Sequence, residues 1–170
     1  MKSLVYGAGN TLVSDEGFGV HLVDYLQRHW AFPDAVELLD GGTLGIMTGY
    51  RVEEVDHLIL IDVLDADGPP GEVRRFELHD LLLDRLPVKL SPHQIGIQEM
   101  LSLSALRGRL PQSATLFGVI PASFAAGISL SPPLAAALGA VADLVVAELE
   151  RQGHRLIPLR EHGAPALQAC

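Results

Sequence analysis

The stretch His57–Val63, with the sequence HLILIDV, constrains the fold more than any other part of the chain. Its residues Leu58 to Ile61 are all apolar, so a strand built from them must be buried on both faces. Such strands are typical of parallel sheets that are covered by helices on each side. This stretch therefore predicts the central strand of an α/β domain.

Four further strands complete the sheet. Short apolar runs predict them at residues 3–6, 36–39, 72–78 and 114–120. The turn ADGPPG before residue 72 is too short to cross the sheet, so the strand that follows should run antiparallel to its predecessor or lie at an edge. The alternation of strands and helices implies right-handed crossovers and a mostly parallel five-stranded sheet with helices on both faces.

The helices are predicted from apolar residues that repeat at helical spacing. We expect one that is capped by Asp15 and carries Phe18, Leu22, Leu26 and Trp30, one around residues 43–52, one from Gln94 to Gly108 and one from Ser131 to Gly153. No repeat or linker divides the chain. We therefore predict a single domain over residues 1–153, followed by a tail over residues 154–170.

Composition limits the partners and the compartment. The chain has 170 residues, 48% of them hydrophobic, and a net charge of -9 with scattered basic residues, which argues against a nucleic-acid partner. Residues 110–142 carry no charge but are interrupted by prolines, so no membrane span or membrane partner is expected. The apolar start is too short for a signal peptide, and Cys170, the single cysteine, allows no internal disulfide. We expect a cytoplasmic protein.

Acidic residues follow three of the predicted strands at their carboxyl ends, where open α/β sheets bind ligands. Glu16 follows the first strand, Asp40 ends the second, and Asp62 lies near the end of the central strand. Two of these carboxylates also have simpler interpretations. Glu16 could favour the first turn of the next helix, and Asp62 could accept backbone N–H groups.

His93 lies in the stretch LSPHQIGI, just before the helix expected at Gln94. A lone histidine is more often a surface residue or a cap than a metal ligand. Together, however, Glu16, Asp62 and His93 bring two carboxylates and an imidazole from three elements, and a divalent cation would relieve the repulsion between the carboxylates. A nitrogen and oxygen ligand set with open positions suits exchangeable nickel, zinc, manganese or iron.

Motifs of several other catalytic classes are missing from the sequence. It contains no HExxH, GxSxG or GxxxxGK[ST] motif. The stretch GAGNTL, residues 7–12, has the first two glycines of a dinucleotide-binding turn but lacks the third. Asp40 could then be the ribose-binding acid, although it lies farther along the chain than is usual. A dinucleotide-binding oxidoreductase module is therefore one alternative.

Five stretches, in this order and spacing, resemble the maturation endopeptidases of nickel-iron hydrogenases: GAGNTLVSDEGFGVH, LLDGGTLG, HLILIDV, LSPHQIGI and LFGVIP. The resemblance covers roughly residues 1–153. It implies an α/β fold with a twisted five-stranded sheet. It also implies an enzyme that removes a C-terminal extension from the hydrogenase large-subunit precursor after nickel has been inserted.

The resemblance also assigns the metal contacts of the family to Glu16, Asp62 and His93. Nickel held by cysteines of the substrate is what such enzymes recognise, so the protein need not carry a metal of its own. We hypothesise that the three side chains complete the coordination of this nickel and so position the scissile bond. A chaperone or checkpoint that binds nickel without proteolysis is the other alternative, although three ligands without cysteine make a poor metal store.

The DGG segment of the family falls on Asp40, Gly41 and Gly42. We hypothesise that Asp40 is the general base of an aspartate- and metal-assisted peptide hydrolysis, in which nickel polarises the carbonyl or the attacking water. Gly41 and Gly42 are expected to form a tight turn that lets the substrate backbone approach.

Overall fold

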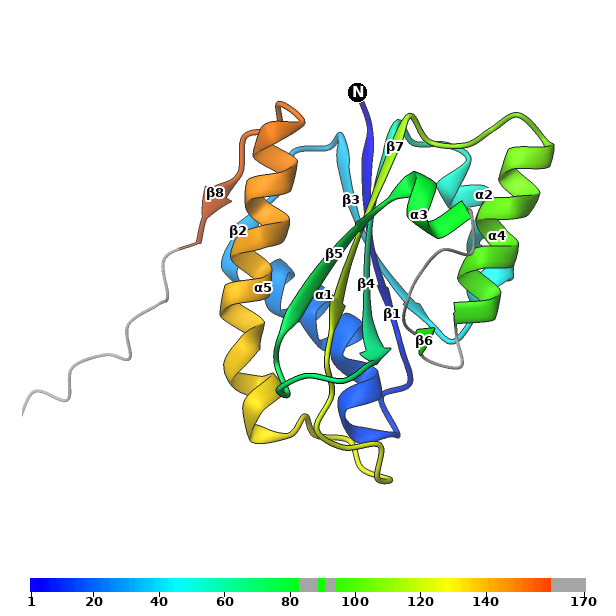
Figure 1. The fold of residues 1–170 in the computed structure, drawn as a ribbon. Helices are drawn as coiled ribbons and strands as arrows, with labels where there is room; N and C mark the ends of the chain where they lie inside the picture. Colours follow the sequence, from blue (N-terminus) through cyan, green and yellow to red (C-terminus); the bar gives the residue numbers. More distant parts are fainter. Residues whose placement is uncertain (83–88, 91–93, 160–170) are drawn as a thin grey trace, which may run out of the picture.

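A mixed main sheet organises the molecule. The structure is a computed structural model, and it describes residues 1–82, 89–90 and 94–159. Five strands form the main path of the sheet in the order β3-β1-β4-β7-β5 (Figure 1). Four of them are parallel: β1 (Ser3–Ala8), β3 (Val36–Gly42), β4 (His57–Asp65) and β7 (Ser113–Val119). The prediction of a single-domain α/β fold with a mostly parallel five-stranded sheet is confirmed.

The remaining strands are antiparallel to their partners. β5 (Val73–Glu77) lies at the edge of the sheet beside β7, as its short preceding turn predicts. The two-residue strand β6 (Lys89–Leu90) pairs with the end of β4. Away from the main sheet, β2 (Trp30–Ala31) pairs with β8 (Ile157–Pro158).

Helices cover both faces of the sheet (Figure 1). On one face lie α1 (Phe18–His29) and α5 (Pro132–Arg151). The other face is covered by α2 (Gly49–Val52), α3 (Leu78–Leu82) and α4 (Gln94–Leu106). Two short 3-10 helices, η1 (Ser14–Gly17) and η2 (Gly45–Thr48), lead into α1 and α2.

The alternation of side chains along β4 divides the core into two clusters. Ile59, Ile61 and Val63 pack in the cluster with α1 and α5, whereas Leu58, Leu60 and Leu64 pack in the cluster with α4. Asp62 lies between Leu60 and Leu64 in this alternation. Its side chain therefore belongs to the α4 face of the sheet.

The long uncharged run becomes β7, a loop and α5, as predicted. In the described part of the chain, α5 is the one helix whose length and apolar composition would suffice to cross a membrane. Its inner face packs into the core cluster of the sheet through Leu134, Val141, Ala142, Val145 and Leu149.

Two predictions about α1 are wrong. Trp30 was expected on the helical stripe, but its backbone is extended and it pairs with Pro158 of β8. Asp15 was expected to cap α1, but no side chain caps either η1 or α1. The carboxylate of Asp15 instead accepts hydrogen bonds from a loop that is distant in the sequence.

The predicted boundary at residue 153 stays a prediction. The chain beyond it includes the buried Leu156 and β8.

Candidate functional site

Three acidic residues lie at the carboxyl edge of the sheet. Gly7 of β1 pairs with Asp40 of β3 on one side and with Ile61 of β4 on the other. Asp40 and Asp62 therefore flank the end of β1, on backbones that are two strand spacings, about 10 Å, apart. Glu16 lies in η1, which follows the loop after β1.

Tyr6 of β1 is buried between the two strands that carry Asp40 and Asp62. Its hydroxyl lies 2.9 Å from Oγ1 of Thr48 and donates to the Gly41 carbonyl oxygen at 3.5 Å. Burial raises the pKa of the Tyr6 hydroxyl, and the charges of Asp40 and Asp62 raise it further, while the hydrogen bond with Thr48 acts in the opposite direction. The Tyr6 hydroxyl therefore lies within the electrostatic influence of both strand-end carboxylates.

Asp40 begins a tight turn at the end of β3. The Gly42 N–H donates to Oδ1 of Asp40 at 3.0 Å, and Gly42 has a φ of +46°, which favours glycine. At Gly41 a Cβ would lie 2.1 Å from Cζ of Tyr6, so packing excludes any larger residue. The turn therefore requires both glycines for its own structure, and their role in substrate binding stays a prediction.

Close backbone contacts place Glu16 at this same edge. A Cβ on Gly9 would lie 1.8 Å from the Glu16 carbonyl oxygen, and a Cβ on Gly19 would lie 2.5 Å from the Ile61 carbonyl oxygen. These glycines let η1 and the first turn of α1 lie directly against the ends of β1 and β4. Glu16 is consequently 6% exposed.

Asp62 is 0% exposed, and its Oδ1 accepts a hydrogen bond from the Val63 N–H at 2.8 Å. This bond matches the simpler interpretation of Asp62, but it does not exclude a second role for the carboxylate. Burial of a charged carboxylate is costly, and a cation at this edge would offset the cost.

His93, the third predicted metal ligand, lies outside the described residues. Among the residues that the structure describes, no group of three His, Cys, Asp or Glu side chains is arranged to hold a metal ion. The metal-binding roles of Glu16, Asp62 and His93 therefore stay predictions. The helix that follows His93 begins at Gln94, as predicted.

Asp15 has a role that sequence reasoning missed. The side chain is buried, and its Oδ2 accepts hydrogen bonds from the Ala122 N–H (2.8 Å), the Ser123 N–H (2.9 Å) and the Ser131 hydroxyl (2.8 Å). Its Oδ1 accepts from the Ser131 N–H at 2.7 Å. Asp15 thus holds the loop 121–131 against η1. The nearest of these partners is 107 positions away in the sequence, so no local pattern signals the contact.

A pocket of about 230 Å³ opens beside Asp40. Its lining comes from the loop after β1, the turn after β3 and the start of α1: Gly9, Asn10, Thr11, Leu12, Val20, Asp40, Gly42 and Thr43. Apart from Asp40, these residues carry no charge. The pocket is smaller than most small-molecule sites and suits one side chain or a short stretch of peptide.

The glycine-rich turn after β1 does not favour a dinucleotide. Gly7 packs against the Gly19 carbonyl group and Gly9 against that of Glu16, so both glycines serve close packing. The carboxylates of Asp15 and Glu16 are buried in the helical turn that follows. Two negative charges at this position oppose the binding of a pyrophosphate.

The family model and the relatives that match this chain are all hydrogenase maturation or formation proteins. A family model described as hydrogenase maturation protease matches residues 20–148. The chain is 37% identical over 162 residues to the hydrogenase 2 maturation protease of Escherichia coli (strain K12), an alignment that covers 93% of this chain and 96% of that protein. It is 46% identical over 118 residues to the hydrogenase expression/formation protein HupD of Thiocapsa roseopersicina, covering 69% of this chain and 53% of that relative, about half its length.

A solved structure shares the fold over nearly the whole chain. The hydrogenase maturating endopeptidase HybD of E. coli superposes with a TM-score of 0.87 at 36% sequence identity. The match covers 93% of this chain and 98% of the other.

Proposed function

The chain belongs to the hydrogenase maturation protease family, a family of processing endopeptidases, and we propose that it removes a C-terminal extension from the large-subunit precursor of a nickel-iron hydrogenase after nickel insertion. One observation carries the proposal at the level of the site. Asp40 and Asp62 lie on the two strands that flank the end of β1, at the carboxyl edge of the sheet. Glu16 is packed against the same edge.

Nickel enters this proposal as part of the substrate. Glu16 and Asp62 are buried at the sheet edge and offer oxygen donors, and His93 adds a nitrogen donor just before α4. Contact with nickel would relieve the cost of burying the two carboxylates. A precursor without nickel lacks this contribution, so the enzyme would act only after the metal has been inserted.

Asp40 is the proposed general base. Its carboxylate is exposed, lines the pocket and is oriented by the Gly42 N–H, so it can reach a water molecule beside a bound peptide. The water oxygen attacks the scissile carbonyl carbon while Asp40 takes one proton. Asp40 then returns this proton to the leaving amine as the C–N bond breaks. The substrate nickel polarises the carbonyl or the water.

The test is incubation of the protein with a large-subunit precursor, with and without nickel, followed by mass spectrometry of the products. We expect a C-terminal peptide to be released from the nickel-loaded precursor alone. Asp40→Asn should lower kcat by about 100-fold or more, since general-base catalysis contributes that much. Glu16→Gln, Asp62→Asn and His93→Ala should each abolish nickel-dependent cleavage. Glu150→Gln on the exposed side of α5 is the matched control.

Two results would contradict parts of the proposal. If His93→Ala cleaved as well as wild type, the arrangement of three nickel contacts would be wrong. If the wild-type protein bound the loaded precursor but left it at full length, the alternative of a nickel-binding checkpoint would replace the endopeptidase. Because His93 must be neutral to bind nickel, cleavage should also decline in acidic solution.

We also propose that the reaction takes place in the cytoplasm, without a nucleic acid or a membrane as partner. The net charge of -9 argues against a nucleic-acid partner, and the packing of α5 against the sheet argues against a membrane span. Fractionation of cells with compartment markers tests it.

A further inference from the structure

Two loops at the carboxyl edge of the sheet form one surface. The Ser14 N–H donates to the Gly127 carbonyl oxygen at 2.8 Å, and the Gly127 N–H donates to the Leu12 carbonyl oxygen at 3.0 Å. The Ser14 hydroxyl donates to the Ser129 carbonyl oxygen at 3.0 Å. With the bonds to Asp15, these contacts join residues 12–15 to the loop 121–131.

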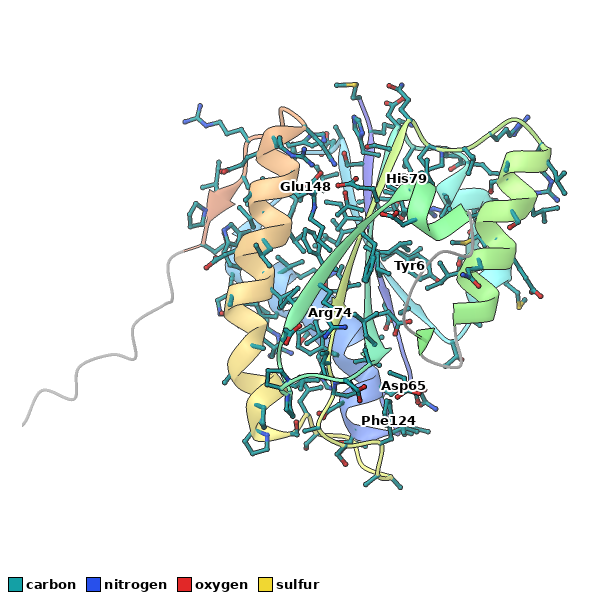
Figure 2. The ribbon with its side chains drawn as sticks, viewed as in Figure 1. Tyr6, Asp65, Arg74, His79, Phe124 and Glu148 are labelled. Carbon is teal, nitrogen blue, oxygen red and sulfur yellow. The ribbon has the colours of Figure 1, made fainter. Side chains whose placement is uncertain are left out.

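Three large apolar side chains project from this surface, and we name them the apolar rim: Leu12, Phe124 and Ile128. Leu12 is 66% exposed, Phe124 47% and Ile128 71%. In Figure 2, Phe124 lies at the lower end of the molecule, the end to which the β4 arrow points. Because the Gly127 N–H bonds to the Leu12 carbonyl oxygen, Leu12 lies beside the backbone that carries Ile128. Exposed apolar side chains that adjoin one another beside a functional site commonly mark a contact with a partner.

The two loops that carry the rim contain no charged residue next to it in the sequence. Residues 9–14 and 120–134 contain no Lys, Arg, Asp or Glu, in a chain whose net charge is -9. Leu12 also lines the pocket that contains Asp40, so the rim continues directly into the site. A ligand that covers the rim and reaches Asp40 buries Leu12 most favourably when it presents an uncharged, apolar surface to it.

We propose that the apolar rim docks an uncharged, apolar segment of the substrate polypeptide next to the scissile bond. This inference rests on the proposed function, and it adds the chemistry of the substrate segment. The hydrogen bonds that join the two loops hold the rim in place before the substrate arrives. Docking therefore costs little loop ordering, which favours affinity.

The test compares the cleavage of nickel-loaded precursor by wild type, Leu12→Ser, Phe124→Ser and Ile128→Ser. We expect KM to rise by about fivefold or more for at least two variants, while kcat stays within about twofold, because the lost contacts bind substrate and transition state alike. Leu106→Ser is the matched control, since Leu106 is 86% exposed at the C-terminal end of α4, away from this edge. Ile128→Val should keep most of the wild-type affinity.

A direct measurement of precursor binding distinguishes a loss of docking from a loss of catalysis or of folding. In an Asp40→Asn background, the Kd for the loaded precursor should rise with each rim substitution, and circular dichroism should be unchanged. Unchanged KM and Kd in all three folded rim variants would overturn the inference. It would also be overturned if the substitutions abolished self-association of this chain while precursor binding stayed the same. A wild-type protein that failed to cleave any precursor would instead contradict the proposed function.

Discussion

Tyr6 connects the packing of the sheet with the chemistry of its edge. The ring fills the space that a side chain at Gly41 would need, and the hydroxyl contacts Thr48 at the start of α2. The same hydroxyl lies within the electrostatic influence of Asp40 and Asp62. A change in the charge of this edge is therefore felt at a residue inside the core.

The raised pKa of Tyr6 predicts a loss of stability in alkaline solution. The unfolded chain releases this proton near pH 10, whereas the folded protein keeps it to higher pH. The stabilisation is thus fully present below about pH 10 and is lost as the pH rises through the folded pKa. The free energy of unfolding, measured by urea denaturation at a series of pH values above about 10, should fall more steeply with pH for wild type than for Tyr6→Phe. Equal slopes would contradict the assignment.

Helix α1 approaches the sheet unusually closely through Gly19. A Cβ at this position would lie 2.3 Å from the Ala8 carbonyl oxygen and 2.5 Å from that of Ile61. Backbone atoms cannot move aside as a flexible side chain can. The position of η1, and with it that of Glu16, therefore depends on a glycine that takes no part in the chemistry.

Gly19→Ala should displace the start of α1 from the sheet. We expect the free energy of unfolding to fall by about 2 kcal/mol, as is typical of overpacked sites, together with a loss of cleavage activity. Urea denaturation and the precursor assay measure the two effects. Gly139→Ala in α5 is the matched control, because a Cβ there meets its nearest atom at 3.4 Å and alanine favours a helix. Wild-type activity in Gly19→Ala would show that Glu16 does not depend on this contact.

Elements with a strong local pattern could be predicted from the sequence. The apolar run of β4 and the Ser-Pro start of α5 have unambiguous local signals, and the positions of Asp40 and Asp62 follow from the ends of their strands. The features that depend on distant partners could not be predicted. Trp30 continues a helical stripe but pairs with β8, and the carboxylate of Asp15 bonds to a loop more than a hundred positions away.

At the scale of the whole molecule, β4 belongs to both core clusters. Alternate residues of this strand pack against α1 and α5 on one face and against α4 on the other. Unfolding of either cluster would therefore expose residues of the strand on which the other cluster is built. We infer that the described domain unfolds as one cooperative unit.

Truncations on the two faces should consequently behave alike. Leu149→Ala in α5 and Met100→Ala in α4 remove fully buried side chains from different clusters, and each should lower the free energy of unfolding by about 2–5 kcal/mol. Urea transitions followed by far-UV circular dichroism and by the fluorescence of Trp30, the single tryptophan, should coincide for both variants. Separate transitions in Met100→Ala would indicate that the α4 face unfolds independently.

The hydrogen bonds of the Asp15 carboxylate affect the exchange of loops between members of the family. The loop 121–131 is held by hydrogen bonds to Asp15 and Ser14, so its conformation depends on residues outside the loop. If this loop alone were transferred from another family member, it would lack the residues 12–15 of its original chain and would not adopt its original conformation. Substrate preference should therefore be inherited as a pair of segments, with residues 12–15 and 121–131 moving together.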